Sequence, residues 1–112
     1  MNWLHPLTDQ ILSAREFPGN QRRALVLWVN ELSVICDQHV PRAPAPDLMP
    51  PGESKLLQVT WILNDRYFAI GVTEGLRLLL VLNDPHGTLH QEEPTHQELR
   101  THVQSLFDGW RP

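Results

Sequence analysis

The sequence has little cysteine and no long apolar run, and each shortage excludes a class of protein. Cys36 is the only cysteine, so no disulfide can form within the chain, as is usual in a reducing compartment. The most apolar stretch runs from Leu76 to Leu82, whereas a helix needs about 20 residues to span a bilayer. The first residues also lack the basic and apolar regions of a signal peptide. We therefore expect a cytoplasmic protein with no membrane contact.

Basic residues are too few and too scattered for a typical nucleic-acid-binding surface. Lys55 is the only lysine, and Arg22 and Arg23 are the only adjacent arginines. Nine basic residues against thirteen acidic ones give a formal net charge of −4. Nucleic-acid-binding domains usually have the opposite balance. We therefore expect no direct binding to nucleic acid; an acidic chain is better suited to a basic protein partner.

The sequence motifs of common enzymes and cofactor sites are missing as well. The six glycines are isolated, so no phosphate-binding loop opens a helix. Cys36 falls on the apolar stripe of a predicted helix, where a thiol behaves as a small hydrophobe. No serine has the context of a nucleophile elbow. The sequence therefore predicts no cofactor, no metal and no catalytic residue.

Six histidines leave one enzymatic alternative open. None of them has the spacing of a zinc-binding motif such as HExxH. His86, His90 and His96 could act together with an acid from Asp84 to Glu92 only if the fold brings them to one place. In that case the chain would be a small metal-dependent enzyme.

The first part of the chain, residues 1–39, has the hydrophobic pattern of two helices. A short helix is predicted from Leu7 to Phe17, with Thr8 as its N-cap. Asn20 is predicted to cap a longer helix that ends near His39. Apolar or aromatic residues recur along this second helix at three- and four-residue steps. They are Leu25, Trp28, Leu32, Ile35, Cys36 and His39.

Residues 40–55 contain five of the ten prolines and predict an extended connector. Proline fixes its own φ and favours extended geometry in the residue before it. The connector separates the helical part from residues 56–93, where the hydrophobic period changes to two.

A period of two is typical of β-strands, and turn residues divide residues 56–93 into four of them. We predict strands over 56–63, 66–73, 76–83 and 88–93, the last polar enough to be an edge. Gly75 is expected to take positive φ in the second turn. Thr95 and Glu98 then have capping-box spacing, which predicts a final helix within 94–112, closed by Gly109.

These elements predict one domain, residues 1–112, of the α+β class. Its architecture is a four-stranded antiparallel meander with two N-terminal helices and one C-terminal helix. The predicted sheet has a second face that is too apolar for open water, made of Leu56, Ile62, Tyr67, Ala69, Leu79 and Val81. Either helices cover both faces of the sheet or a partner covers one of them. We therefore take Tyr67, Leu79 and Val81 as candidate partner-binding residues.

The four tryptophans add a second set of candidates. Trp28 and Trp61 fall on buried stripes and are predicted core residues. Trp3 and Trp110 lie outside the periodic positions, and their simplest role is to dock the chain ends onto the domain. The alternative is that they anchor a partner, and Arg111 beside Trp110 would then belong to the same surface.

Taken together, the sequence favours a small non-enzymatic protein-binding module of the adaptor, inhibitor or immunity type, as in accessory proteins of bacteria and phages. It would act by covering the surface of a partner protein, with a basic protein as one suitable target. The alternative is a homodimer formed through the same sheet face, with a ligand-binding or regulatory role.

Overall fold

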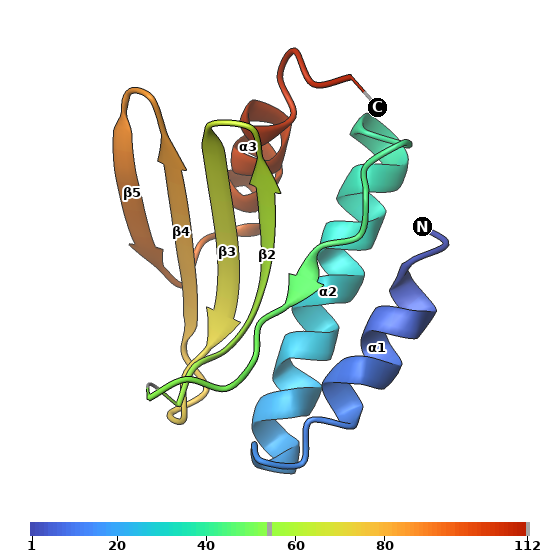
Figure 1. The fold of residues 1–112 in the computed structure, drawn as a ribbon, viewed down its shortest axis with the longest axis vertical. Coiled ribbons are helices and arrows are strands. Elements are labelled where there is room, and N and C mark those ends of the chain that lie inside the picture. Colours follow the sequence, from blue (N-terminus) through green and yellow to red (C-terminus); the bar gives the residue numbers. More distant parts are fainter. Residues whose placement is uncertain (54, 112) are drawn as a thin grey trace.

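A computed structural model describes residues 1–53 and 55–111 and shows a sheet with three helices on one side (Figure 1). The helices are α1 (Leu4–Leu12), α2 (Gly19–His39) and α3 (His96–Leu106). The strands are β1 (Asp47–Leu48), β2 (Leu57–Leu63), β3 (Arg66–Val72), β4 (Leu78–Asp84) and β5 (Gly87–Glu92). Each strand pairs antiparallel with its neighbour in chain order. The α+β class and the antiparallel meander are confirmed, but the sheet has five strands and not the predicted four.

The strand that the prediction missed, β1, lies inside the proline-rich segment. Asp47 pairs with Thr60 and Leu48 with Val59, and the amide of Met49 donates to the carbonyl of Gln58 at 3.0 Å. A two-residue strand has no periodicity that a sequence could reveal. The surrounding prolines also keep it short, because proline cannot donate to a strand ladder.

Two buried indoles hold the proline-rich segment against the domain. The Nε1–H of Trp3 donates to the carbonyl of Ala43 at 3.2 Å, and that of Trp61 donates to the carbonyl of Pro44 at 2.8 Å. The two rings meet edge to face, with centroids 6.2 Å apart. Trp61 also lies 5.3 Å from the ring of Phe107, beyond the end of α3. One tryptophan of β2 therefore joins the connector and the C-terminal part to the sheet.

The main core lies between the helices and one face of the sheet. The strands contribute alternate residues that are all buried: Leu57, Val59, Trp61, Phe68, Ile70, Val72, Leu78, Leu80 and Leu82. Each such side chain contributes roughly 1.5–3 kcal/mol by leaving water. On α2 the buried stripe differs from the predicted one, since Val29 is buried, Trp28 is only partly buried and His39 is exposed.

The N-terminal helix boundaries also differ from the prediction. α1 begins at Leu4 with Trp3 as its N-cap, so Thr8 lies inside the helix and does not cap it. Pro6 is tolerated because the amides of the first turn have no partner within the helix. The second helix begins at Gly19, and its N-cap is Pro18 rather than Asn20.

The capping box of α3 is confirmed. The Thr95 hydroxyl accepts from the amide of Glu98 at 3.1 Å, and the Glu98 carboxylate accepts from the amide of Thr95 at 2.9 Å. These hydrogen bonds lower the pKa of the Glu98 carboxyl, with a further hydrogen bond from Gln91 adding to the effect. The C-terminal end of the same helix is held by the Arg66 guanidinium, which donates to the carbonyls of Ser105, Leu106 and Asp108.

Candidate interaction surface

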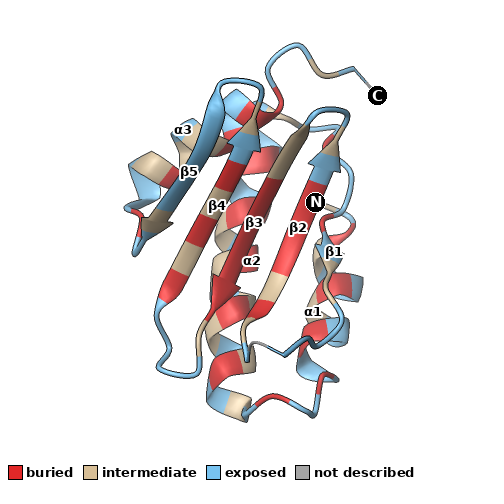
Figure 2. Ribbon diagram, turned by 60° about the vertical axis from the view of Figure 1, so that its left-hand side comes forward, coloured by how far each residue is buried: buried red, intermediate tan, exposed pale blue. Residues whose placement is uncertain are grey.

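The face of the sheet opposite the helices has no covering element in the described chain (Figure 2). We call it the uncovered face. Strand register places on it the residues Gln58, Thr60, Ile62, Tyr67, Ala69, Gly71, Leu79, Val81, Asn83, Thr88, His90 and Glu92. The residues of the predicted second face are therefore on one side of the sheet, and no helix lies over them.

The middle of the uncovered face is apolar and built from small residues bordered by larger ones. Ala69 and Thr60 are buried although no helix lies above them. Tyr67, Leu79 and Val81 are partly exposed, and Ile62 is 66% exposed. Ile62 lies near the β2–β3 turn and extends this exposed apolar surface to the end of the face.

A shallow hollow of about 370 Å³ lies at the end of this face nearest the turn between β3 and β4. Leu56 and Leu79 line it, together with Thr73 and the Lys55–Glu74 ion pair, which has an N–O distance of 3.3 Å. Gly71 leaves room for Leu56, since a Cβ at position 71 would lie 2.9 Å from Cδ1 of Leu56. The lack of a side chain at Gly71 therefore lets Leu56 form one wall of the hollow.

The border of the uncovered face has an excess of one negative charge, from Asp47. Its two cations are already ion-paired, Lys55 with Glu74 and Arg77 with Glu92 at 3.0 Å. Asp47 of β1 is exposed beside Thr60, and within the described chain it takes part in no ion pair. A surface that meets this border is therefore favoured if it brings cations.

The tryptophan candidates lie away from the uncovered face. Trp3 is 7% exposed and packs in the core, so its ring docks the start of the chain and offers little surface to a partner. Trp110 is partly buried and packs edge to face on Phe107, with ring centroids 5.4 Å apart. Arg111 is exposed beside it.

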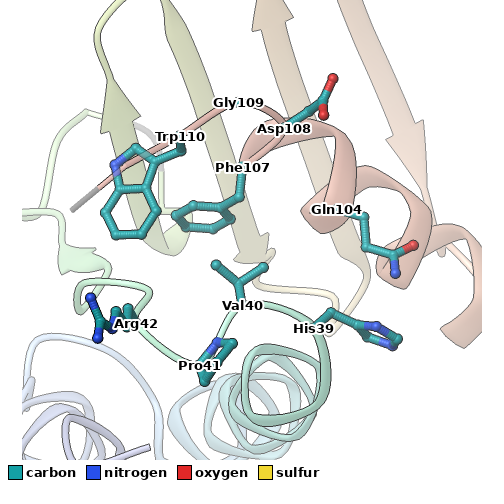
Figure 3. A pocket seen from close by; sticks show the side chains of 9 residues that line it. All are labelled: His39, Val40, Pro41, Arg42, Gln104, Phe107, Asp108, Gly109 and Trp110. Carbon is teal, nitrogen blue, oxygen red and sulfur yellow. The ribbon is translucent and has the colours of Figure 1, made fainter.

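Trp110 lines a cleft of about 460 Å³ between the ends of α2 and α3 (Figure 3). Val40 and Phe107 lie between the two helix ends, while Arg42 and His39 come from the connector and the end of α2. Among the described residues, no ion pair joins two side chains of this cleft. It therefore offers an aromatic wall with a polar border, without a paired acid and base.

A further apolar groove of about 540 Å³ runs along the outer side of α2, lined by Leu27, Trp28, Asn30, Glu31 and His96. Leu27 is 68% exposed, and the Glu31 carboxylate is 2.8 Å from Nδ1 of His96. This groove was not predicted, because Trp28 was assigned to the core. Leu27 lies two residues after Leu25, which is on the buried stripe of α2, so its side chain points away from that stripe.

The residues that could carry chemistry are separated from one another. Cys36 is fully buried, and burial, followed by the nearby Asp37 carboxylate, raises the pKa of its thiol to about 12. His90 lies on the uncovered face, whereas His96 pairs with α2 on the helical side of the sheet. Within residues 1–53 and 55–111, no group of three or more His, Cys, Asp or Glu residues could hold a metal ion. The convergence of histidines that the enzymatic alternative requires is not formed.

None of the helices in the described part of the chain has the length and apolarity needed to cross a membrane. No protein-family model, no curated protein and no solved structure matches the chain.

Proposed function

We propose that this chain is a non-enzymatic protein-binding module that uses the uncovered face to occlude a surface of a basic partner protein. The observation that carries the proposal is the apolar surface of Ile62, Tyr67, Leu79 and Val81, which no element of the described chain covers. Contiguous exposed apolar patches of this kind on small proteins are commonly interaction sites.

The size of the face indicates the type of complex. Strands β2, β3 and β4 have seven residues each and β5 has six, so together they span about 23 Å by 19 Å, or about 440 Å² in projection, from the usual strand rise and spacing. Complexes that bury less than about 1,200 Å² in total are mostly weak and exchange rapidly. A partner that covers only this face would therefore bind reversibly, and one that also covers the border would bind more tightly.

The shape and the charges of the face define the chemistry of the partner. The hollow beside Leu56 and Leu79 would hold one apolar side chain of the partner, which would act as an anchor in the way that hot-spot residues fill pockets in other interfaces. Asp47, beside Thr60, favours a lysine or arginine of the partner at that position, and the formal net charge of −4 would steer a basic protein towards the complex.

The first test compares two neighbouring leucines of β4 that point to opposite faces. Leu79→Glu changes a partly exposed side chain on the uncovered face, and we expect it to cost no more than about 1 kcal/mol of unfolding free energy. Leu80→Glu places a charge in the core, where Leu80 is 0% exposed, and should prevent folding. Urea unfolding followed by circular dichroism measures both. Unfolding of Leu79→Glu would show that this face is part of the core.

The second test asks whether folded variants lose a partner. Tagged wild-type protein, Val81→Glu and the control Leu12→Glu are compared by quantitative capture from the source cell. Leu12 is 42% exposed on α1, away from the uncovered face. We expect a basic protein that wild type and Leu12→Glu retain and Val81→Glu loses by at least about tenfold. Equal capture by all three proteins, or a shared loss, contradicts the proposal.

A further inference from the structure

The two edges of the sheet differ in how they are protected. At one edge, β1 is only two residues long, lies among prolines and is contacted by α1. At the other edge, β5 has six residues, and no segment lies beyond it in the described chain (Figure 1). Natural proteins usually protect such an edge with proline, lysine or a bulge. β5 contains no proline, lysine or arginine.

The ladder shows which backbone groups of β5 point outwards. The amide of Glu93 donates to the carbonyl of Leu78 at 2.8 Å, and hydrogen-bonded pairs alternate along an antiparallel ladder. Gln91 and Leu89 therefore bond to β4, whereas the N–H and C=O groups of Thr88, His90 and Glu92 point away from the sheet. These three residues form a template to which another strand can pair.

We infer that β5 pairs antiparallel with β5 of a second copy of this chain, forming a two-fold dimer through their sheet edges. With the axis beside His90, the pairs are His90 with its own counterpart and Thr88 with Glu92 of the other copy. This register gives about six backbone hydrogen bonds, two for each of the three facing pairs. No two carboxylates are directly opposed, and Glu92 is already paired with Arg77.

Side chains on the helical side of β5 fit the same register. Leu89 is 38% exposed on the edge strand, although its cross-strand neighbour Leu82 is buried. In the dimer Leu89 faces Gln91 of the second copy, so part of its apolar surface leaves water. A second copy explains this exposure, whereas a monomer leaves it in solvent.

Within residues 1–53 and 55–111, the edge opposite β5 is formed by the two-residue strand β1, and this limits the assembly to two copies. Once the β5 strands pair, the outer edges of the dimer are the two β1 strands, which cannot extend the ladder. The inference does not depend on the proposed function, because the uncovered face of each chain remains accessible beside the new contact.

The test is the solution mass of the full chain by light scattering over a tenfold concentration range, with two variants. Wild type and Val81→Glu should both have twice the chain mass of 12.9 kDa. His90→Pro removes an outward N–H that β4 does not use, so it should leave the fold intact and raise the dimer dissociation constant by about 100-fold. A monomeric wild type overturns the inference, and so does a His90→Pro protein whose dimer dissociation constant equals that of wild type.

Amide hydrogen exchange keeps the inference testable if His90→Pro does not fold. In wild type the amides of Thr88, His90 and Glu92 should exchange slowly, at rates similar to those of Leu89 and Gln91, and become faster on dilution. Rapid exchange of the three outward amides at all concentrations overturns it. If Val81→Glu alone gives monomers, the dimer forms through the uncovered face, and the assignment to β5 is wrong.

Discussion

At the scale of the residue, Leu76 has a backbone conformation that leucine rarely adopts. Its φ is 65°, in the left-handed region, and its side chain is 45% exposed. A branched side chain in this region costs about 1–2 kcal/mol, and glycine avoids the cost. Positive φ was predicted at Gly75, but the structure has it at the adjacent Leu76, so the strain of the turn falls on Leu76. β4 begins two residues later, at Leu78.

We expect Leu76→Gly to raise the unfolding free energy by about 0.5–1 kcal/mol, since relief of strain exceeds the small loss of burial. The control is Val34→Gly on α2, which is 46% exposed in a helical position and should lower stability by about the same amount. Urea midpoints measure both variants. A lower midpoint for Leu76→Gly contradicts the account of this turn.

The buried thiol of Cys36 makes the stability of the fold decrease at alkaline pH. Its thiol has a pKa near 12, against an ordinary value of 9.0, because burial disfavours the thiolate. Because the pKa is raised in the folded state, the contribution of the protonated thiol to the unfolding free energy is complete below pH 9.0. This contribution is lost as the pH rises towards 12. Over this range, wild type should lose more unfolding free energy than Cys36→Ala. Parallel pH profiles for the two proteins would show that the thiol does not contribute.

At the scale of the element, Gln21 joins the start of α2 to the ends of two strands. Its side-chain amide donates to the carbonyl of Lys55 at 2.7 Å and to that of Val72 at 2.8 Å, and the residue is 0% exposed. Leucine at this position keeps the volume but leaves both carbonyls without this donor. A buried acceptor without a partner costs about 1–3 kcal/mol, but Gln21→Leu also removes the buried Oε1, which has no hydrogen-bond partner in the described chain. We therefore expect Gln21→Leu to lower stability by about 1 kcal/mol.

Thermal unfolding of Gln21→Leu and of Gln38→Leu, an exposed glutamine of the same helix, provides the comparison. The exposed substitution should change stability by less than about 0.5 kcal/mol. Equal stability of the two variants would show that the contacts of Gln21 contribute nothing net.

The elements also show which parts of the fold the sequence makes visible. Long periodic segments, the polar edge strand and the Thr95–Glu98 capping box are predicted because each depends on nearby residues. β1 depends on pairing with β2 across the chain, and Gln21 looks like a surface residue until its two distant acceptors are known. Asp47 was likewise missed as a border residue, because its position follows from that same pairing.

At the scale of the whole molecule, the second apolar face could be predicted from alternation in β2, β3 and β4, but the layer order could not. Whether helices cover one or both faces depends on where α1 and α2 cross the sheet, and local patterns do not encode this. In the structure all three helices lie on the same side, which leaves Tyr67, Leu79 and Val81 accessible together. Their neighbour Ile62 was on the predicted face but not among the selected candidates.

The measurement that tests the central claim most directly is site-specific photo-crosslinking in the source cell, with the photoreactive residue at Tyr67 or at Leu12. We expect a covalent adduct with one basic protein from position 67 and no such adduct from position 12, since only the first lies on the uncovered face. No adduct from position 67, the same adduct from both positions, or an adduct made only of two copies of this chain would contradict it.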